Sequence, residues 1–202
     1  MPNDRTGQPS RDEDLLQACR RGDASALERL LLRYQNRLYN VIARICSNPD
    51  DAAELTQDTF VKIIENIDKF QGKSSFYTWS FRIAVNLTLN HCRRRAKIGF
   101  RSLDVEAGEP GESTTQLLRE FLSDDKSPDP EDVAVNRELC EVVSACLLNL
   151  DEMHRTVITL RDIEGMSYTD IAQVLDIEIG TVRSRLSRAR ARLRRLLEDV
   201  LE

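Results

Sequence analysis

Residues 179–197 read IGTVRSRLSRARARLRRLL, and this stretch decides the fold of the C-terminal part of the chain. At helical spacing its apolar residues form one stripe, so the arginines have to cover the remaining helix surface. No acidic residue lies among them. The stripe consists of Val182, Leu186, Ala189, Leu193 and Leu196, and the cations are Arg183, Arg185, Arg188, Arg190, Arg192, Arg194 and Arg195. We therefore expect a helix that packs by one face and presents a cationic outer surface.

A second amphipathic helix is expected immediately upstream, from Ser167 to Ile177. The next three residues, 178–180, leave room only for a tight turn, so Thr181 is the expected N-cap of the arginine-rich helix. Two helices joined in this way are typical of a helix-turn-helix, whose second helix enters the major groove of DNA. A solvated charged face is the competing interpretation, but the turn, the preceding helix and the missing acids together favour DNA binding.

The first turns of the second helix reach the bases in such a motif. A bidentate arginine contact to guanine discriminates between bases by about 1–3 kcal/mol, whereas a phosphate contact mainly adds affinity and salt dependence. We expect Ser184 and Arg188 to read bases. Phosphate contacts or packing are the expected roles of Arg183, Arg185 and Arg190.

The composition is that of a polar globular protein whose charges are segregated along the chain. The 202 residues are 41% apolar and 31% charged, with a net charge of −5. Residues 74–103 contain no acid, whereas residues 50–68 carry six acids against one lysine. Because the local field steers a polyanion, the acidic total does not exclude nucleic-acid binding. No apolar run of 18 residues occurs and the N-terminus lacks a hydrophobic segment, so we expect a cytoplasmic protein without membrane insertion.

The hydrophobic periodicity predicts helices in both halves of the chain and no strand of useful length. The expected helices are Asp12–Arg21, Asp23 to the break at Asn48-Pro49, residues 51–70 capped by Asp50, Phe76 to about Lys97 capped by Ser75, Val133–Leu148 and Asp151–Glu164, followed by the helix-turn-helix. In the third of these, the residues expected to face inward are Leu55, Phe60, Ile63, Ile64 and Ile67.

Between the two groups of helices the composition changes. Residues 101–132 are rich in Gly, Pro, Ser, Thr and acids, which predicts a flexible acidic linker with at most a short helix at Thr115–Leu122. The expected fold is therefore all-α, with two small helical bundles joined by this linker and the helix-turn-helix in the second.

The cysteines favour a structural role. Their number is odd, none has CxxC spacing, and each lies among apolar neighbours, so we expect reduced, buried thiols and neither a redox nor a zinc role. His91 beside Cys92 is a weak indication of a metal, since adjacent helical residues point in different directions. No cofactor or metal is expected. The cysteines are Cys19, Cys46, Cys92, Cys140 and Cys146.

A second cationic region combines aromatic residues, a polar loop at 71–75 and a helix that ends in Arg93, Arg94 and Arg95. Stacking surfaces beside a positive track are suited to single-stranded DNA, where each stacked base contributes about 1–3 kcal/mol. Trp79 shares a face with apolar residues and is expected in the core. The residues polar enough to contact DNA are Lys73, Ser74, Tyr77, Arg82, Asn86 and Asn90.

The acidic third helix admits two functional interpretations. Asp50, Asp51, Glu54 and Asp58 resemble the aspartate-rich magnesium motif of helical diphosphate enzymes. Only one such motif occurs, and acids in a first turn also complement the helix dipole. Binding of a protein partner is the better interpretation, because the outer face of this helix carries apolar residues as well as acidic ones.

Three segments together resemble one family, the extracytoplasmic-function sigma factors of the sigma-70 class. DAAELTQDTFVKI at 51–63 resembles the segment that binds the β′ coiled coil of RNA polymerase. GKSSFYTWSFRIAVNLTLNHCRRR at 72–95 resembles the segment that melts and reads the −10 element. SYTDIAQVLDIEIGTVRSRLSRARARL at 167–193 resembles the helix-turn-helix that reads the −35 element.

The resemblance implies a promoter-specificity subunit, not an enzyme, with core RNA polymerase (β′ coiled coil and β flap), promoter DNA and an anti-sigma factor as partners. It implies an N-terminal tail at 1–11, a region 2 domain at 12–100, a linker at 101–132 and a region 4 domain at 133–202. The residues it implies are, for −35 DNA, Thr181, Arg183, Ser184, Arg185, Ser187 and Arg188; for −10 DNA, Lys73, Ser74, Ser75, Tyr77, Arg82, Asn86, Asn90, Arg93 and Arg94; and for polymerase, Asp51, Glu54, Leu55, Gln57, Asp58, Phe60 and Val61.

The chain departs from the family pattern at three positions. Asp176 occupies a turn position where glycine is usual, and aspartate tolerates the left-handed conformation better than most residues. Ser187 is small where a bulky residue is common, and Thr56 replaces an aliphatic residue. Two other functions remain open at this point: a dimeric helix-turn-helix regulator that works without polymerase, and the magnesium-dependent enzyme.

Overall fold

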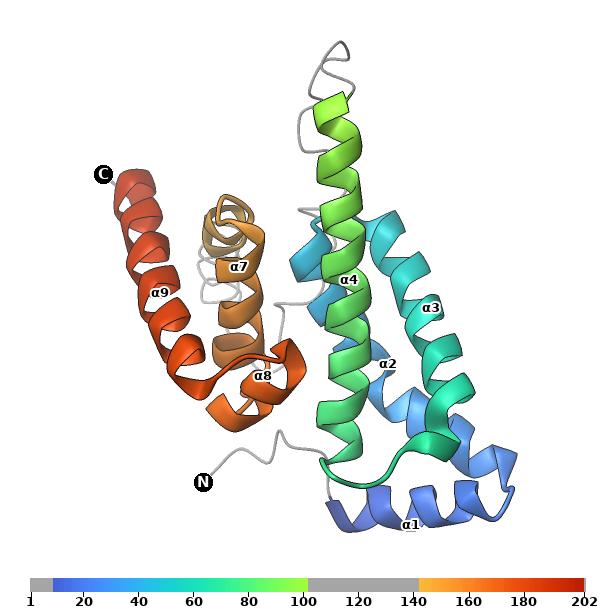
Figure 1. The fold of residues 1–202 in the computed structure, drawn as a ribbon. Helices are drawn as coiled ribbons and strands as arrows, with labels where there is room; N and C mark the ends of the chain where they lie inside the picture. Colours follow the sequence, from blue (N-terminus) through green and yellow to red (C-terminus); the bar gives the residue numbers. More distant parts are fainter. Residues whose placement is uncertain (1–8, 102–141, 202) are drawn as a thin grey trace, which may run out of the picture.

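The computed structural model describes residues 9–101 and 142–201, which are helical with no strand among them (Figure 1). The expected linker, the helix at Thr115–Leu122, Cys140 and the start of the helix at Val133 lie outside these residues. The elements are α1 (Pro9–Arg20), α2 (Ala24–Cys46), α3 (Pro49–Asn66), the 3₁₀ turn η1 (Ile67–Lys69), α4 (Phe76–Arg101), a helix at 142–148, α7 (Glu152–Ile158), the π-helical turn η2 (Thr159–Ile163), α8 (Tyr168–Leu175) and α9 (Ile179–Leu201).

The N-terminal bundle is built on the apolar face of α2. Tyr34, Leu38 and Ile42 are fully or almost fully buried, and the predicted periodicity of this helix is confirmed. Helices α1, α3 and α4 all pack against α2, and α3 also packs against α4. Helix α4 stands between α2 and α3 on one side and the C-terminal helices on the other (Figure 1).

The start of α3 differs from the prediction. Asn48 is the N-cap, its side chain accepts a hydrogen bond from the Asp51 backbone N–H at 3.0 Å, and Pro49 is the first helical residue. The prediction of Asp50 as cap was therefore wrong, because proline is well suited to the first position and moves the helix start upstream. Ile64 is also exposed, with 50% of its surface accessible, and not inward as expected.

Helix α1 is held to the bundle by a buried carboxylate that the periodicity did not indicate. Asp12 is 7% exposed and accepts hydrogen bonds from the Arg33 guanidinium and the Tyr34 hydroxyl of α2. Tyr34 is itself 1% exposed. Asp12 is thus the polar partner that allows a tyrosine hydroxyl to lie inside this core.

The C-terminal bundle departs from the expected single helix over Asp151–Glu164. Helix α7 starts after its N-cap Asp151 and widens into η2, and Gly165 then turns the chain at a φ of 77°. Ser167 caps α8, which ends at Leu175 and not at Ile177 as predicted, so the turn precedes the predicted residues 178–180. Asp176 adopts the left-handed conformation at a φ of 54°, as the glycine that is usual at this position in the family implied. Helix α9 begins at Ile179, so the prediction of Thr181 as its N-cap was wrong and Thr181 lies within the first turn.

The two predicted helical bundles are confirmed, and they pack directly against each other. Helix α8 lies on α4, and α7 and η2 lie on α2 (Figure 1). The buried apolar side chains of both bundles form one continuous cluster. No helix in the described ranges is long and apolar enough to span a membrane.

Candidate nucleic-acid interface

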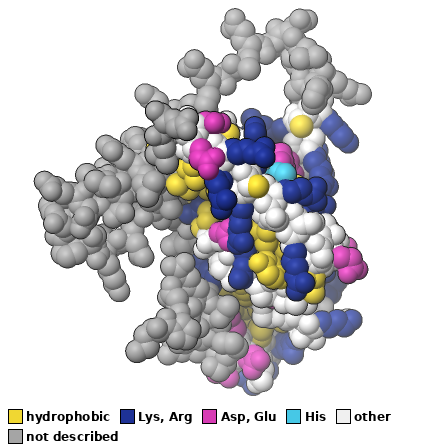
Figure 2. Space-filling view, turned by 90° about the vertical axis from the view of Figure 1, so that its left-hand side faces the viewer, with side chains coloured by type: hydrophobic (Ala, Val, Ile, Leu, Met, Phe, Trp, Pro, Cys, Tyr) yellow, Lys and Arg dark blue, Asp and Glu magenta, His cyan; other side chains and the backbone are white. Residues whose placement is uncertain are grey.

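The outer face of α9 carries the predicted readout residues. The apolar stripe is confirmed, since Val182, Leu186 and Ala189 are buried. Arg183, Ser184, Ser187 and Arg188 are exposed. The Arg188 Nε donates a hydrogen bond to the Ser184 carbonyl oxygen at 3.3 Å, so the two residues expected to read bases lie together. Lys and Arg side chains gather over the side of the molecule on which α9 lies (Figure 2).

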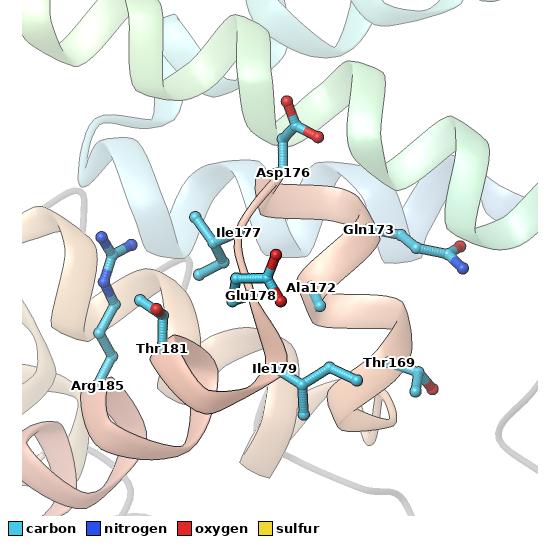
Figure 3. A pocket seen from close by; sticks show the side chains of 9 residues that line it. All are labelled: Thr169, Ala172, Gln173, Asp176, Ile177, Glu178, Ile179, Thr181 and Arg185. Atoms are coloured by element: carbon cyan, nitrogen blue, oxygen red, sulfur yellow. The ribbon is translucent and has the colours of Figure 1, made fainter.

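A hollow between α8 and α9 adjoins this face. Thr181 and Arg185 are half-buried in its wall, while Asp176 points out of it toward α4 (Figure 3). The hollow combines hydroxyl, amide, carboxylate and guanidinium groups with apolar side chains. The lining residues are Thr169, Ala172, Gln173, Asp176, Ile177, Glu178, Ile179, Thr181 and Arg185.

Arg190 is committed to packing within the bundle. Its Nε and Nη2 donate to the two carboxylate oxygens of Asp162 in η2, at 3.0 and 2.5 Å. The hydrogen bond with Asp162 raises the pKa of the Arg190 guanidinium. This bidentate pair joins α9 to η2, and it directs Arg190 away from the face that holds Arg188.

The predicted single-strand face lies along α4. Arg82, Asn86, Asn90, Arg93 and Arg94 are all exposed at helical spacing, and Lys73 and Ser75 are exposed in the preceding loop while Ser74 is half-buried. Ser75 is confirmed as the cap of α4, because its hydroxyl accepts from the Thr78 backbone N–H at 3.0 Å.

Trp79 packs as expected for a core residue. Its ring centroid lies 5.1 Å from that of Phe70 and 5.7 Å from that of Phe76. The indole is half-buried, and these two aromatic neighbours fix the start of α4 against the bundle.

Tyr77 lies in a buried polar network that sequence patterns did not indicate. It is 6% exposed, and its hydroxyl donates to Glu164 at 3.1 Å. The Arg37 Nε donates to the same carboxylate at 2.6 Å, and the guanidinium lies 4.6 Å from the Tyr77 ring centroid. Burial raises the pKa of Glu164 while Arg37 opposes this, and burial together with Glu164 raises the pKa of the Tyr77 hydroxyl. These three residues come from α2, α4 and the end of η2.

The acidic helix α3 presents a mixed face. Glu54, Gln57, Asp58 and Val61 are exposed, whereas Leu55 is 5% exposed and Phe60 is half-buried. Asp51 instead turns to α4, where its carboxylate forms an ion pair with Arg95 and lies 3.2 Å from the Nε2 of His91. Among the described residues, no group of His, Cys, Asp and Glu could hold a metal ion.

Comparison with known proteins decides the family. The Sigma-70 region 2 family matches residues 30–98, and the Sigma-70, region 4 family matches residues 140–193. The RNA polymerase sigma-H factor of Pseudomonas aeruginosa is 34% identical over 194 residues, which cover 94% of this chain and 95% of the relative. The ECF RNA polymerase sigma-E factor of Haemophilus influenzae is also 34% identical over 194 residues, which cover 94% of this chain and 97% of the relative. The chain belongs to the ECF sigma factors.

Two solved structures have the same architecture. The sigma factor RpoE in complex with the anti-sigma factor NepR from Bartonella quintana is 28% identical with a TM-score of 0.63, covering 85% of this chain and 96% of that one. CnrH, solved in complex with the cytosolic domain of CnrY, has a TM-score of 0.64 at 24% identity, covering 94% of this chain and 98% of that one, and shows the fold.

This ECF sigma factor is therefore a transcription initiation factor that directs RNA polymerase to promoters, and not an enzyme. The predicted family and function are confirmed, and the magnesium-dependent alternative is set aside. The acidic first turn of α3 now has a structural explanation, since the carboxylate of Asp51 binds the guanidinium of Arg95 on α4.

Four of the five cysteines lie in the described part of this sigma factor, and all four are free: Cys19, Cys46, Cys92 and Cys146. Burial raises the pKa of each of these thiols, in the case of Cys92 to about 11. A raised thiol pKa leaves little reactive thiolate at neutral pH.

Proposed function

We propose that the two bundles divide promoter recognition between them. Region 2 would comprise residues 12–100, region 4 residues 133–202, and residues 101–132 would connect them. The observation that carries the proposal is the separation of exposed charge: α3 presents Glu54 and Asp58, while α4 and α9 present arginines. Acidic and cationic faces on separate helices fit separate protein and DNA partners.

The DNA contacts are proposed on α9 and α4. Arg188 and Ser184 read bases of the −35 element, because they are exposed, adjacent and near the start of the recognition helix. The remaining proposed −35 residues, Thr181, Arg183, Arg185 and Ser187, flank them. On α4, Arg82, Asn86, Asn90, Arg93 and Arg94 form the track for the −10 element, with the loop residues Lys73, Ser74 and Ser75 at its start. Tyr77, which was predicted to belong to this set, is buried and is left out of it.

The polymerase contact is proposed on α3, where Glu54, Gln57, Asp58 and Val61 share an exposed face above the buried Leu55 and the half-buried Phe60. Asp51 is the member of this set whose carboxylate is already paired, so its contribution would be to fix α3 against α4. The β′ coiled coil of the polymerase is the proposed partner of α3, and the β flap that of region 4.

An anti-sigma factor is a further proposed partner. The sigma factor RpoE that resembles this chain was solved with the anti-sigma factor NepR. Such a partner would act in the cytoplasm, where we also place this chain.

Transcription in vitro tests the division of roles. Core polymerase with the purified chain should give promoter-dependent transcripts from genomic DNA, and Asp58→Lys should abolish them by weakening polymerase binding in a pull-down. Glu13→Lys is the matched control, because Glu13 is exposed on α1, away from α3. Equal losses in both variants would contradict the polymerase role of α3, and palindromic footprints by the chain alone would favour a dimeric regulator.

A further inference from the structure

The loop at 71–75, which we propose to contact the −10 element, is held between two buried aromatic residues. Phe70 follows η1 and Phe76 begins α4, with 7% and 2% of their surface exposed. Their ring centroids lie 6.1 Å apart at an interplanar angle of 87°. Lys73 and Ser75 between them are exposed. The two ends of the loop are therefore held close together while its polar residues stay accessible.

Arg20, the last residue of α1, contacts the start of this loop. Its Nη2 donates a hydrogen bond to the Phe70 backbone carbonyl oxygen at 2.9 Å, across 50 positions of the sequence. In Figure 1, α1 lies at the bottom of the molecule, next to the connection from η1 to α4. A charged donor holds a carbonyl more strongly than a neutral donor does. The orientation of the peptide group that leads from Phe70 into the loop therefore depends on a side chain of α1.

Helix α1 is itself fixed near its other end. Asp12 accepts hydrogen bonds from Arg33 and from the Tyr34 hydroxyl of α2. The Tyr34 ring centroid lies 5.6 Å from that of Phe76, so this anchor also borders the end of the loop. Leu16, one turn after Asp12, is buried against the bundle. Helix α1 is thus a firm support from which its last residue reaches the loop.

We propose that Arg20 is a positioning residue for promoter opening, because its hydrogen bond to the Phe70 carbonyl fixes the loop at 71–75 in the conformation that captures an unpaired base. The inference rests on the proposed −10 role of this loop. A loop that became ordered only on binding would lose conformational entropy at that step and bind more weakly. Arg20 lowers this cost without touching the DNA.

The test compares two neighbouring arginines in the full chain. Arg20→Met removes the charge and the donors but keeps an unbranched side chain that packs easily. Arg21→Met is the matched control, because Arg21 is exposed and its side chain makes no hydrogen bond or ion pair with any residue that the structure describes. Each variant loses one positive charge, so a difference between them does not come from net charge. Urea titration verifies that both are folded.

Trp79 reports on the start of the loop in the free chain. It is the only tryptophan in the sequence, and its ring centroid lies 5.1 Å from that of Phe70. When the Phe70 carbonyl loses its donor, the packing of Phe70 on the indole should loosen. Acrylamide should then quench the fluorescence of Arg20→Met more strongly than that of the parent chain, whereas Arg21→Met should match the parent. This measurement involves neither DNA nor polymerase.

The second measurement is the binding of each holoenzyme to single-stranded oligonucleotides. They carry the non-template strand of a −10 element found by transcription in vitro, either intact or with one base at a time replaced by an abasic site. Arg20→Met should bind the intact strand about two- to ten-fold more weakly than the parent, which is the effect of one hydrogen bond on an equilibrium. Where the abasic site removes the captured base, the two should bind equally. Any loss in Arg21→Met should be the same on every strand, because phosphate attraction does not depend on the base.

Equal losses in Arg20→Met on the intact and all abasic strands, as in Arg21→Met, would overturn the positioning role, and so would unchanged quenching of Trp79. Failure of the −10 assignment gives a different pattern. In that case acrylamide still quenches Arg20→Met more strongly, while Arg20→Met and Lys73→Ala both bind every strand as the parent does. The two hypotheses are therefore tested separately.

Discussion

Arg188 and Arg190 lie two positions apart on α9, and they have different surroundings in the structure. Arg188 is exposed and rests against Ser184, whereas both carboxylate oxygens of Asp162 hold Arg190. Replacing Arg188 by alanine should remove a bidentate base contact that discriminates by about 1–3 kcal/mol, or roughly 5- to 150-fold. Arg190→Ala should leave discrimination intact. It should cost at most about 1 kcal/mol of stability, because the pair is half-exposed and screened by solvent.

The assay is competition binding of the holoenzyme to promoter duplexes in which each base pair of the upstream element is changed in turn. Arg188→Ala should flatten the preference at one position and leave the others as they were. A uniform loss across all duplexes, with a salt slope reduced by about 0.9, would mean that Arg188 contacts a phosphate. A loss of discrimination in Arg190→Ala equal to that in Arg188→Ala would refute the separation of roles on this helix.

Three other predictions concern stability and reactivity. Asp12→Ala should lower the free energy of unfolding by about 1–3 kcal/mol in urea titrations, because it leaves the buried Tyr34 hydroxyl without its acceptor. Adding Tyr34→Phe to the Asp12→Ala variant removes that hydroxyl and should recover part of the lost free energy. Gly165→Ala should cost about 1–2 kcal/mol in the same titration, since no atom lies within 4 Å of the added Cβ and the whole penalty comes from the φ of 77°. Cys92, whose pKa is raised to about 11, should react with iodoacetamide at pH 8 about a hundred-fold more slowly than a thiol whose pKa is 9.0. The rate of alkylation should rise with pH up to about pH 11. Peptide mass spectrometry measures this rate, and a fast reaction at pH 8 in the folded chain would contradict the raised pKa.

Local patterns predicted the helices and their buried faces. The stripe of α9, the face of α2 and the cap at Ser75 follow from spacing within one helix, and each is present in the structure. The left-handed conformation of Asp176 was implied by the resemblance, because glycine is usual at this position in the family. The exposure of the residues proposed to contact DNA could also be predicted from the sequence, because polar residues at helical spacing point to solvent.

Contacts between distant residues could not be predicted in this way. Glu164 meets Arg37 across 127 positions, and Tyr77 across 87, and nothing in the local sequence of η2 indicates either partner. Tyr77 was therefore assigned to solvent-facing chemistry, although here it is buried. Asn48 replaced Asp50 as a cap because two competent capping residues flank Pro49, and the proline decides between them.

The apolar cluster that the two bundles share has a consequence for the stability of the C-terminal one. A helical unit of about sixty residues buries only about 60% of the surface that it exposes when unfolded, so its own core is marginal. Because the N-terminal bundle covers part of that core, we expect the chain to melt in a single calorimetric transition. The C-terminal unit on its own should melt at a lower temperature than the whole chain.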